Sequence, residues 1–246
     1  MTRFLALALL LSVCPARPAP AAVPGNSQLV VVEQSAANPA RATIRLYQKD
    51  GIFWKARFGP VPALLGKNGT AWGRSPFFAP PRAGQAKREG DKRTPAGIFS
   101  LGPLYGYAAR PARPLAWPYI RLTRNHLAID DPASRSYNKI VDRRQVARDW
   151  NKAGALLEND QPYRWLLEVG HNKTQARAGG GSWIFLHPWI NARTPTDGCT
   201  GLAHDNFFAL LALLEPARQP RLVVVPATSH GRSLLAQLGL GTALAA

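Results

Sequence analysis

Apolar runs in this chain are short, and turns rich in glycine and proline separate them. Runs dominated by β-branched, aromatic and leucine residues lie at 27–33, 117–122, 127–129, 165–169, 182–187 and 221–225. Runs of this length, bounded by turn residues, are typical of strands. The one clear helical period lies at 203–214, where apolar residues recur at i, i+3, i+4 and i+7. The sequence therefore predicts a mostly β domain, a sandwich or an irregular barrel.

A hairpin signal stands near the start of the folded part. Residues 42–47 and 52–58 flank Asp50-Gly51, and an Asp-Gly pair between two alternating runs favours a tight turn. Pro60 and Pro62 are expected to end the second strand, because proline cannot donate a ladder hydrogen bond.

Turn chemistry dominates the stretches between the predicted strands. Residues 72–93 are rich in glycine, proline, lysine and arginine, and they predict a long surface loop that runs on into residues 94–99. Residues 142–151 predict a short helix or a turn.

The first 22 residues read as a secretory signal. A basic start at Arg3, an apolar run over 4–13 and small residues at 19–21 are the three parts of such a signal. Residues 23–27 would follow as a flexible linker. Val13 stands where a lipid-attachment box needs a small residue, so we do not expect a lipid anchor at Cys14.

Removal of the signal leaves Cys199 as the only cysteine. A lone thiol cannot form an internal disulfide, so it is either a buried structural residue or a reactive group. The neighbouring Gly198, a predicted helix after the cysteine and a strand histidine before it favour the reactive alternative.

His187 and Cys199 form the candidate catalytic pair. The thiol attacks only as thiolate, so it needs a base within reach, and His187 ends an apolar run twelve residues earlier. A helix N-terminus behind the sulfur is expected to lower the thiol pKa. Gly198 would let backbone N–H groups approach an oxyanion. The pattern predicts a cysteine acyl-transfer enzyme.

Other polar residues have both a functional and a structural interpretation. His171 either lines the cleft or ends a strand. Asp130, Asp131 and Tyr137 either border a substrate groove or form an ordinary turn. A zinc site made from histidines and Cys199 would lack the paired ligand spacing of zinc proteins, so no metal and no cofactor are expected.

The chain is strongly basic. Its formal net charge is +17, or +15 once Arg3 and Arg17 leave with the signal. No compact block of lysine and arginine occurs, so the charge indicates a carboxylate-rich wall or anionic lipid as partner rather than nucleic acid. No later segment is long and apolar enough for an integral membrane span.

Three ordered blocks resemble the L,D-transpeptidases, the YkuD-type catalytic domain of bacterial cell-wall enzymes. They are Gly-Asp-Lys-Arg-Thr-Pro-Ala-Gly-Ile-Phe at 90–99, Ile-Phe-Leu-His at 184–187 and Thr-Asp-Gly-Cys-Thr at 196–200. The resemblance implies a YkuD-like β-sandwich of mixed sheets, with one main helix after the catalytic cysteine and short peripheral helices. Residues 28–226 would be the catalytic domain with loop insertions, and 227–246 a tail or a short docked helix.

The resemblance also implies a mechanism. Cys199 would attack the amide after the third residue of a peptidoglycan stem peptide, with His187 as base and later acid. The Pro188 carbonyl would orient the histidine, and N–H groups of Gly198 and Cys199 would hold the oxyanion. An acceptor stem amine would then form a crosslink, or water would give carboxypeptidase or endopeptidase activity.

Substrate contacts are expected from the loop around the pair and from one upstream strand end. Gly201 stands where the family often carries arginine or asparagine, and Arg193 could supply that cation. The expected substrate-binding residues are Thr196, Asp197, Thr200, Arg193, His171 and Trp189.

These implications define a periplasmic, monomeric, carbapenem-sensitive enzyme whose partners are donor and acceptor peptidoglycan stem peptides. A rival of another class is a wall-binding protein that keeps the fold without turnover.

Overall fold

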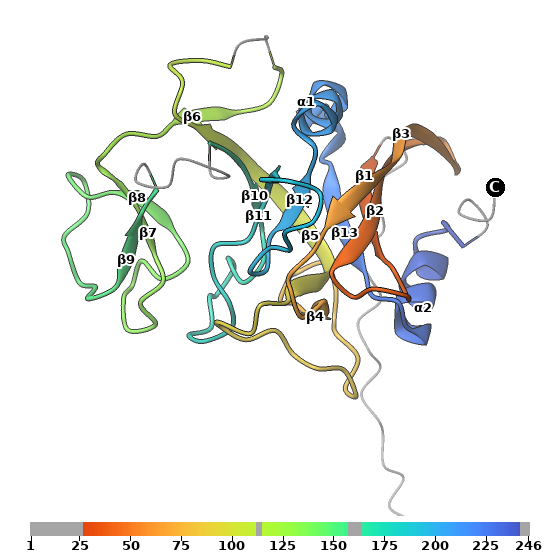
Figure 1. Cartoon of the computed structure of the whole chain (residues 1–246), viewed down its shortest axis with the longest axis horizontal. Helices are drawn as coiled ribbons and strands as arrows, with labels where there is room; N and C mark the ends of the chain where they lie inside the picture. Colours follow the sequence, from red (N-terminus) through yellow and green to blue (C-terminus); the bar gives the residue numbers. More distant parts are fainter. Residues whose placement is uncertain (1–26, 112–114, 157–163, 242–246) are drawn as a thin grey trace, which may run out of the picture.

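The computed structural model describes residues 27–111, 115–156 and 164–241. The predicted signal segment at 1–22, the linker up to residue 26 and the last five residues lie outside this part of the chain. Mixed strands dominate the fold, as predicted (Figure 1).

The elements follow one another along the chain with few helices. The strands are β1 (Gln28–Gln34), β2 (Arg41–Asp50), β3 (Phe53–Leu64), β4 (Thr70–Trp72), β5 (Thr94–Gly106), β6 (Tyr119–Arg121), β7 (His126–Ile129), β8 (Ile140–Asp142), β9 (Ala153–Ala155), β10 (Trp165–Val169), β11 (Phe185–Pro188), β12 (Thr200–Leu202) and β13 (Arg221–Val225). The helices are α1 (His204–Leu213) and α2 (Ser229–Gln237), with a 3₁₀ turn at Pro216–Arg218.

The main sheet follows a closed path of hydrogen-bonded strands. Its order is β10-β11-β12-β3-β2-β1-β13-β5-β4, with β6 on β5, and a further pairing of β10 with β5 joins the two sides. Most pairs are antiparallel, but β1–β13, β11–β12, β4–β5 and β5–β6 are parallel. The thirteen-residue β5 makes this closure because one half pairs with β13 and the other half with β10.

The centre of the sheet is buried on both faces. Alternate residues of β1 and β13 enter two different clusters: Val30 and Val224 pack in the larger core with α1, whereas Val31 and Val223 pack with α2. A strand buried on both faces needs apolar residues at every position, which explains the continuous runs at 29–32 and 222–225.

A second, three-stranded antiparallel sheet, β8-β7-β9, lies to one side of the main sheet (Figure 1). Its outer cluster consists of Ile129, Val141 and Trp150. Residues of β7 and the chain after β9 also join the cluster that contains Cys199, so this small sheet adjoins the candidate site.

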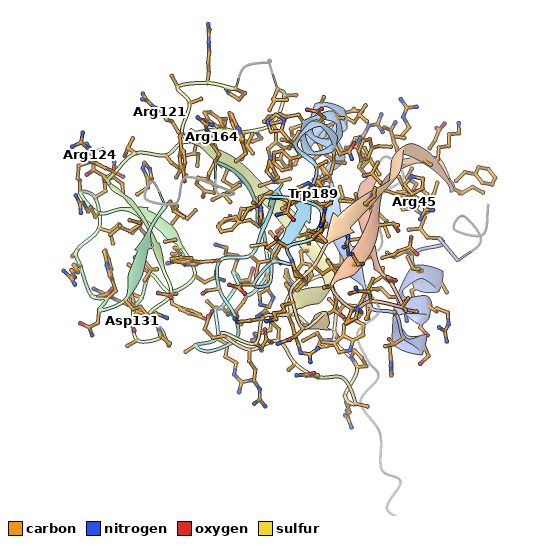
Figure 2. The ribbon with its side chains drawn as sticks, in the orientation of Figure 1. Arg45, Arg121, Arg124, Asp131, Arg164 and Trp189 are labelled. Carbon is orange, nitrogen blue, oxygen red and sulfur yellow. The ribbon has the colours of Figure 1, made fainter. Side chains whose placement is uncertain are left out.

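Basic side chains are distributed widely. Figure 2 shows Arg45 on β2, and Arg121, Arg124 and Arg164 around β6 and the start of β10 on the opposite side of the molecule. No helix of the described residues is long and apolar enough to cross a membrane.

Two of the predicted boundaries are wrong. Pro60 and Pro62 do not end a strand, because β3 continues to Leu64. In this region β3 pairs only with β2, and β12 joins it no earlier than Ala63, so the missing N–H of each proline removes no bond to a second neighbour. Residues 94–99 are not loop, because they form the first half of β5.

The chain immediately after Cys199 also differs from the prediction. A strand, β12, intervenes between the cysteine and α1. Of the two alternatives predicted for residues 142–151, a short helix or a turn, the structure has the turn, at residues 143–145.

Candidate active site

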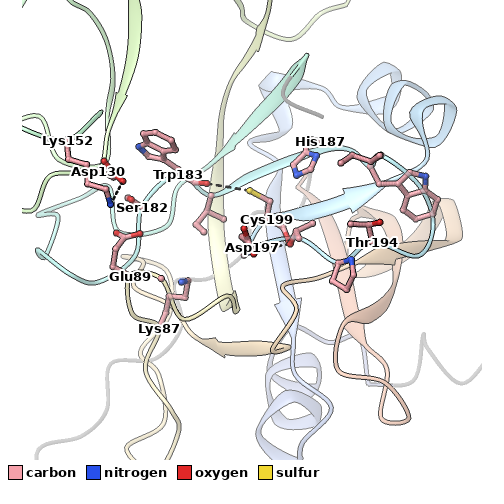
Figure 3. Close-up of a pocket in the computed structure, with 17 residues that line it drawn as sticks. Lys87, Glu89, Asp130, Lys152, Ser182, Trp183, His187, Thr194, Asp197 and Cys199 are labelled. Carbon is pink, nitrogen blue, oxygen red and sulfur yellow. Dashed lines mark hydrogen bonds and ion pairs between the residues drawn. The ribbon is translucent and has the colours of Figure 1, made fainter. Parts of the chain in front are cut away.

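Cys199 and His187 both line one groove of about 650 Å³ (Figure 3). The loop 194–198 and Trp189 form one side of the groove. The other side consists of residues from the loop before β5, from the end of β7 and from the chain leading into β9 and β11: Lys87, Glu89, Gly90, Asp130, Lys152, Ser182 and Trp183.

The parallel pairing of β11 with β12 brings the pair together. In this register Leu186 lies opposite Thr200 and His187 opposite Gly201. Because side chains alternate along a strand, His187 and Cys199 are diagonal neighbours on the same face of the sheet. The eleven residues between them, 188–198, leave β11 and return alongside it.

The His187 imidazole is held by its own chain. Its Nδ1 lies 2.8 Å from the carbonyl oxygen of Pro188. A carbonyl oxygen can only accept, so Nδ1 carries the proton and Nε2 carries the lone pair. The side chain is buried, and burial lowers the pKa of His187 below its usual value. The imidazole is therefore neutral at pH 7 and has the tautomer of a base.

The Cys199 thiol is also neutral at rest. Burial raises its pKa from 9.0 to about 11, opposed by a hydrogen bond from the Phe185 backbone and by the charge of Lys87. The thiol donates to the carbonyl oxygen of Trp183 at 3.5 Å. The expected helix-dipole effect on the sulfur is wrong, because β12 separates Cys199 from α1 and the dipole acts only within about one turn.

Two threonine hydroxyls hold the carbonyl of Cys199. Thr196 Oγ1 donates to it at 2.7 Å, and Thr94 Oγ1 donates at 3.1 Å while accepting from the Gly66 N–H at 2.8 Å. Thr94 opens β5 and is completely buried, so the block at 90–99 anchors the cysteine from a separate part of the chain. No individual role was predicted for Thr94, although it lies in the first of the three family-like sequence blocks.

Gly198 has a backbone that only glycine adopts readily. Its φ is +141°, and an added Cβ would lie 3.1 Å from the Arg93 carbonyl oxygen. Its N–H donates to Thr196 Oγ1 at 3.2 Å. Two backbone N–H groups, those of Gly198 and Cys199, are predicted to hold an oxyanion. The Gly198 N–H already donates within the loop, so the Cys199 N–H is the better candidate for this role.

The far end of the groove carries opposite charges in close pairs. Lys87 Nζ lies 2.5 Å from Asp91, and Lys152 Nζ lies 2.8 Å from Asp130. Glu89 accepts a hydrogen bond from Tyr137 at 2.6 Å. Figure 3 shows Lys87, Glu89, Asp130 and Lys152 on the opposite side of Cys199 from Thr194.

Sequence reasoning identified part of this end of the groove. Asp130 borders the groove, which agrees with the predicted alternative that it borders a substrate groove. Asp131 instead accepts hydrogen bonds from the N–H groups of Ala133 and Asn151, which is the turn interpretation. Lys87, Glu89 and Lys152 were missed because isolated charged residues in loops carry no pattern.

The expected substrate-binding residues divide into two groups. Thr196, Asp197 and Trp189 line the groove. Arg193 is exposed and Thr200 is buried, and neither borders the groove in the described structure.

His171 is a structural residue and does not line the groove. It is 1% exposed, its Nδ1 accepts from the Arg74 N–H, and its Nε2 donates to the Gly180 carbonyl at 2.9 Å. Burial lowers its pKa from 6.5 to about 4. Both ring nitrogens are committed to the loops on either side, so a substrate contact is wrong for this residue.

Metal ligands do not converge anywhere in residues 27–111, 115–156 and 164–241: no group of three or more histidine, cysteine or carboxylate side chains there could hold an ion. The donors and acceptors at the groove are those of nucleophilic and acid–base chemistry.

A comparison with protein-family models agrees with the three sequence motifs. The sequence matches the family model of the L,D-transpeptidase catalytic domain, YkuD, over residues 30–225. A crystal structure of a mutant of the helical cell shape determining protein Pgp2 from Campylobacter jejuni is similar over 90% of this chain, with 14% identity and a TM-score of 0.42. The similar region is 56% of that chain, so this protein spans little more than half its length. No curated protein matched the sequence.

Proposed function

Because this chain belongs to the family of YkuD-type L,D-transpeptidase catalytic domains, we propose that it crosslinks peptidoglycan stem peptides through an acyl-enzyme on Cys199. The observation that carries the proposal is the register of β11 and β12, which makes a neutral His187 and the Cys199 thiol neighbours in one groove. We further propose that it acts in the periplasm after removal of residues 1–22, as a monomer.

The first half-reaction acylates the cysteine. The thiol proton passes to Nε2 of His187 while sulfur bonds to the carbonyl carbon of the donor stem, and the carbonyl oxygen becomes an oxyanion. The N–H of Cys199 is the proposed donor to that oxyanion. Collapse of the intermediate breaks the C–N bond, and Nε2 returns the proton to the departing amine.

The second half-reaction releases the acyl group to an acceptor. An amine of another stem gives a proton to Nε2 of His187 and bonds to the acyl carbon, and the C–S bond breaks as sulfur regains a proton. Water in place of the amine would give a trimmed stem instead of a crosslink.

The neutral resting pair has a consequence for this cycle. Burial raises the pKa of the Cys199 thiol to about 11 and lowers the pKa of His187, and both shifts favour the neutral thiol–imidazole pair over the thiolate–imidazolium pair in the free protein. We propose that the proton moves only as the carbonyl carbon approaches, which protects the thiol between turnovers.

Thr196, Asp197 and Trp189 are the proposed substrate contacts on the loop side of the groove. A carboxylate-bearing stem peptide is attracted to the molecule by its net positive charge.

Intact-mass analysis with a carbapenem tests the nucleophile. The wild-type protein is expected to gain one adduct, and Cys199→Ala is expected to gain none while keeping its fold by circular dichroism. An adduct of equal yield on Cys199→Ala would refute the role of the thiol.

Incubation with purified muropeptides tests the reaction. Crosslinked dimers that require Cys199 would support transfer, whereas trimmed monomers alone would establish the hydrolase. Failure to form either product, together with no carbapenem adduct on Cys199, would indicate the non-catalytic wall-binding protein.

A further inference from the structure

Trp183 has an unusual backbone next to the nucleophile. Its φ is +56°, in the left-handed region, which is sterically unfavourable for a bulky side chain and persists only where neighbours enforce it. The same residue presents its carbonyl oxygen to the Cys199 thiol at 3.5 Å (Figure 3). The strained backbone and the contact with the reacting sulfur therefore belong to one residue.

Asn138 holds the backbone of Trp183. Its Oδ1 accepts from the Trp183 N–H at 3.1 Å, and its Nδ2 donates to the carbonyl oxygens of His171 and Asn172 at 3.0 and 2.9 Å. Asn138 lies between β7 and β8 and is 2% exposed. This buried amide has three partners in the loops that precede β11, so it fixes where Trp183 lies.

Gly154 holds the ring of Trp183. A Cβ on this β9 residue would lie 2.0 Å from Cη2 of the indole, so the ring packs directly on the glycine backbone. The buried indole Nε1 has no hydrogen-bond partner in the described part of the chain. Packing against β9, rather than a polar contact, therefore fixes the ring.

These contacts form a continuous path from the three-stranded sheet to the sulfur. We propose that the β8-β7-β9 sheet controls the reactivity of Cys199 through Trp183, with Asn138 and Gly154 as the positioning residues that hold the Trp183 carbonyl against the thiol. The inference rests on the proposed function only in treating Cys199 as the nucleophile.

The sign of the control follows from hydrogen-bond chemistry. A carbonyl oxygen can only accept, so its contact with sulfur stabilises the protonated thiol. The Phe185 backbone hydrogen bond acts in the opposite direction because it favours the thiolate. Release of the Trp183 carbonyl would leave that second interaction and favour ionisation.

Other ionisable groups around the thiol stay unchanged in this scheme. Lys87 and Asp197 act on it through their charges, and His187 lines the same groove. Tyr105 and Tyr107 pack in the same apolar cluster. None of these is substituted in the test, so a shift in thiol ionisation would report on Trp183.

The test measures the rate of alkylation of the full protein by iodoacetamide as a function of pH. Asn138→Ala and Gly154→Ala are each expected to lower the midpoint of the profile by about one pH unit, a roughly tenfold faster alkylation well below the midpoint. Asn172→Ala is the matched control: it is also a buried, left-handed asparagine, but its side-chain hydrogen bonds go to the backbone of Arg177 and Gly181 and not to Trp183. Its carbonyl oxygen, which accepts from Asn138, is retained in the alanine variant. Gly241→Ala adds a methyl group where there is room, with its closest contact at 3.6 Å.

Both controls are expected to keep the wild-type midpoint. An unchanged midpoint in the two test variants, or an equal shift in Asn172→Ala, would overturn the proposal. If one test variant fails to fold, the other decides. Alkylation needs no enzymatic turnover, so a protein that fails the muropeptide assay still gives a result here.

Discussion

Substitution of His187 should slow the acylation of Cys199 without unfolding the protein. We expect His187→Ala to slow acylation by a carbapenem roughly 10²–10⁴-fold, because the thiol then lacks its general base. A mass-spectrometric time course measures the rate. His204→Ala is the control, since that histidine is largely exposed on α1 and should leave the rate unchanged. Equal rates for wild type and His187→Ala would exclude the imidazole as base.

His171 gives the protein a defined response to acid. The unfolded chain takes up a proton near pH 6.5, whereas the folded protein takes it up only near pH 4. Between these values the unfolded state binds more protons, so stability falls as the pH falls, by about 3 kcal/mol for this residue alone.

Urea unfolding from neutral pH to about pH 4 measures this loss. We expect His171→Gln, which cannot be protonated, to be less stable at neutral pH but to lose less stability on acidification. A parallel loss in both proteins would contradict the assignment.

Single residues also show what the sequence could and could not reveal about the site. Cys199, His187 and Gly198 could be proposed from the sequence because a lone thiol, a strand-end histidine and a glycine before a candidate nucleophile each have a chemical reason. His171 was misassigned because a histidine after a strand looks the same whether its ring faces a groove or two backbone groups. Glu89 and Lys152 reach the groove only through folding of distant loops, which no local pattern predicts.

The Thr94 hydroxyl links the start of β5 to the Cys199 carbonyl, just before β12. Thr94→Val is expected to leave the buried Gly66 N–H without an acceptor and to cost about 1–3 kcal/mol of stability. It also removes one of two donors to the Cys199 carbonyl, so we expect slower acylation as well. Thr94→Ser keeps the hydroxyl and should retain most of both properties. Chemical denaturation and the mass-spectrometric rate together check this, and a fully active Thr94→Val would argue against the anchoring role.

Helix α2 is part of the folded domain. Leu234 and Leu235 pack with Val31 and Val223 on the face of the sheet opposite α1. Leu234→Ala should therefore cost about 2–5 kcal/mol in a denaturation experiment. Gln237→Ala, at an exposed position of the same helix, should change stability by less than about 0.5 kcal/mol. Equal, small effects would mean that the helix is only loosely attached.

Elements with their own pattern were predictable, and those that depend on partners were not. The strands at 28–34, 165–169 and 221–225 and the helix at 204–213 have clear apolar patterns. By contrast, β4, β8, β9 and β12 have three residues each, too few to show a period. The sequence did not predict β12 for this reason. Because β12 separates Cys199 from α1, the predicted effect of the helix dipole on the sulfur was wrong as well.

Across the molecule, composition and turn residues predicted the fold class but not the closed path of strands. The parallel β11–β12 pair, on which the site depends, follows from the loop at 189–199 and not from either strand alone. Likewise, the net charge of the sequence describes the surface as a whole but not the charges inside the groove. The surface is basic, yet the groove itself holds acid–base pairs such as Lys152–Asp130.

The pairing of the first strand with the last also sets the order of folding events. β1 lies between β2 and β13, and Leu29 lies opposite Arg221 in the parallel register. The hairpin of β2 and β3 can form early, but the centre of the sheet must wait until nearly the whole domain has been synthesised. Contacts so distant in sequence make folding slow. A growing chain that ends before residue 221 cannot complete the sheet, so the native structure can arise only late in synthesis or after it. Until then the polypeptide is unfolded enough to be threaded through a narrow pore.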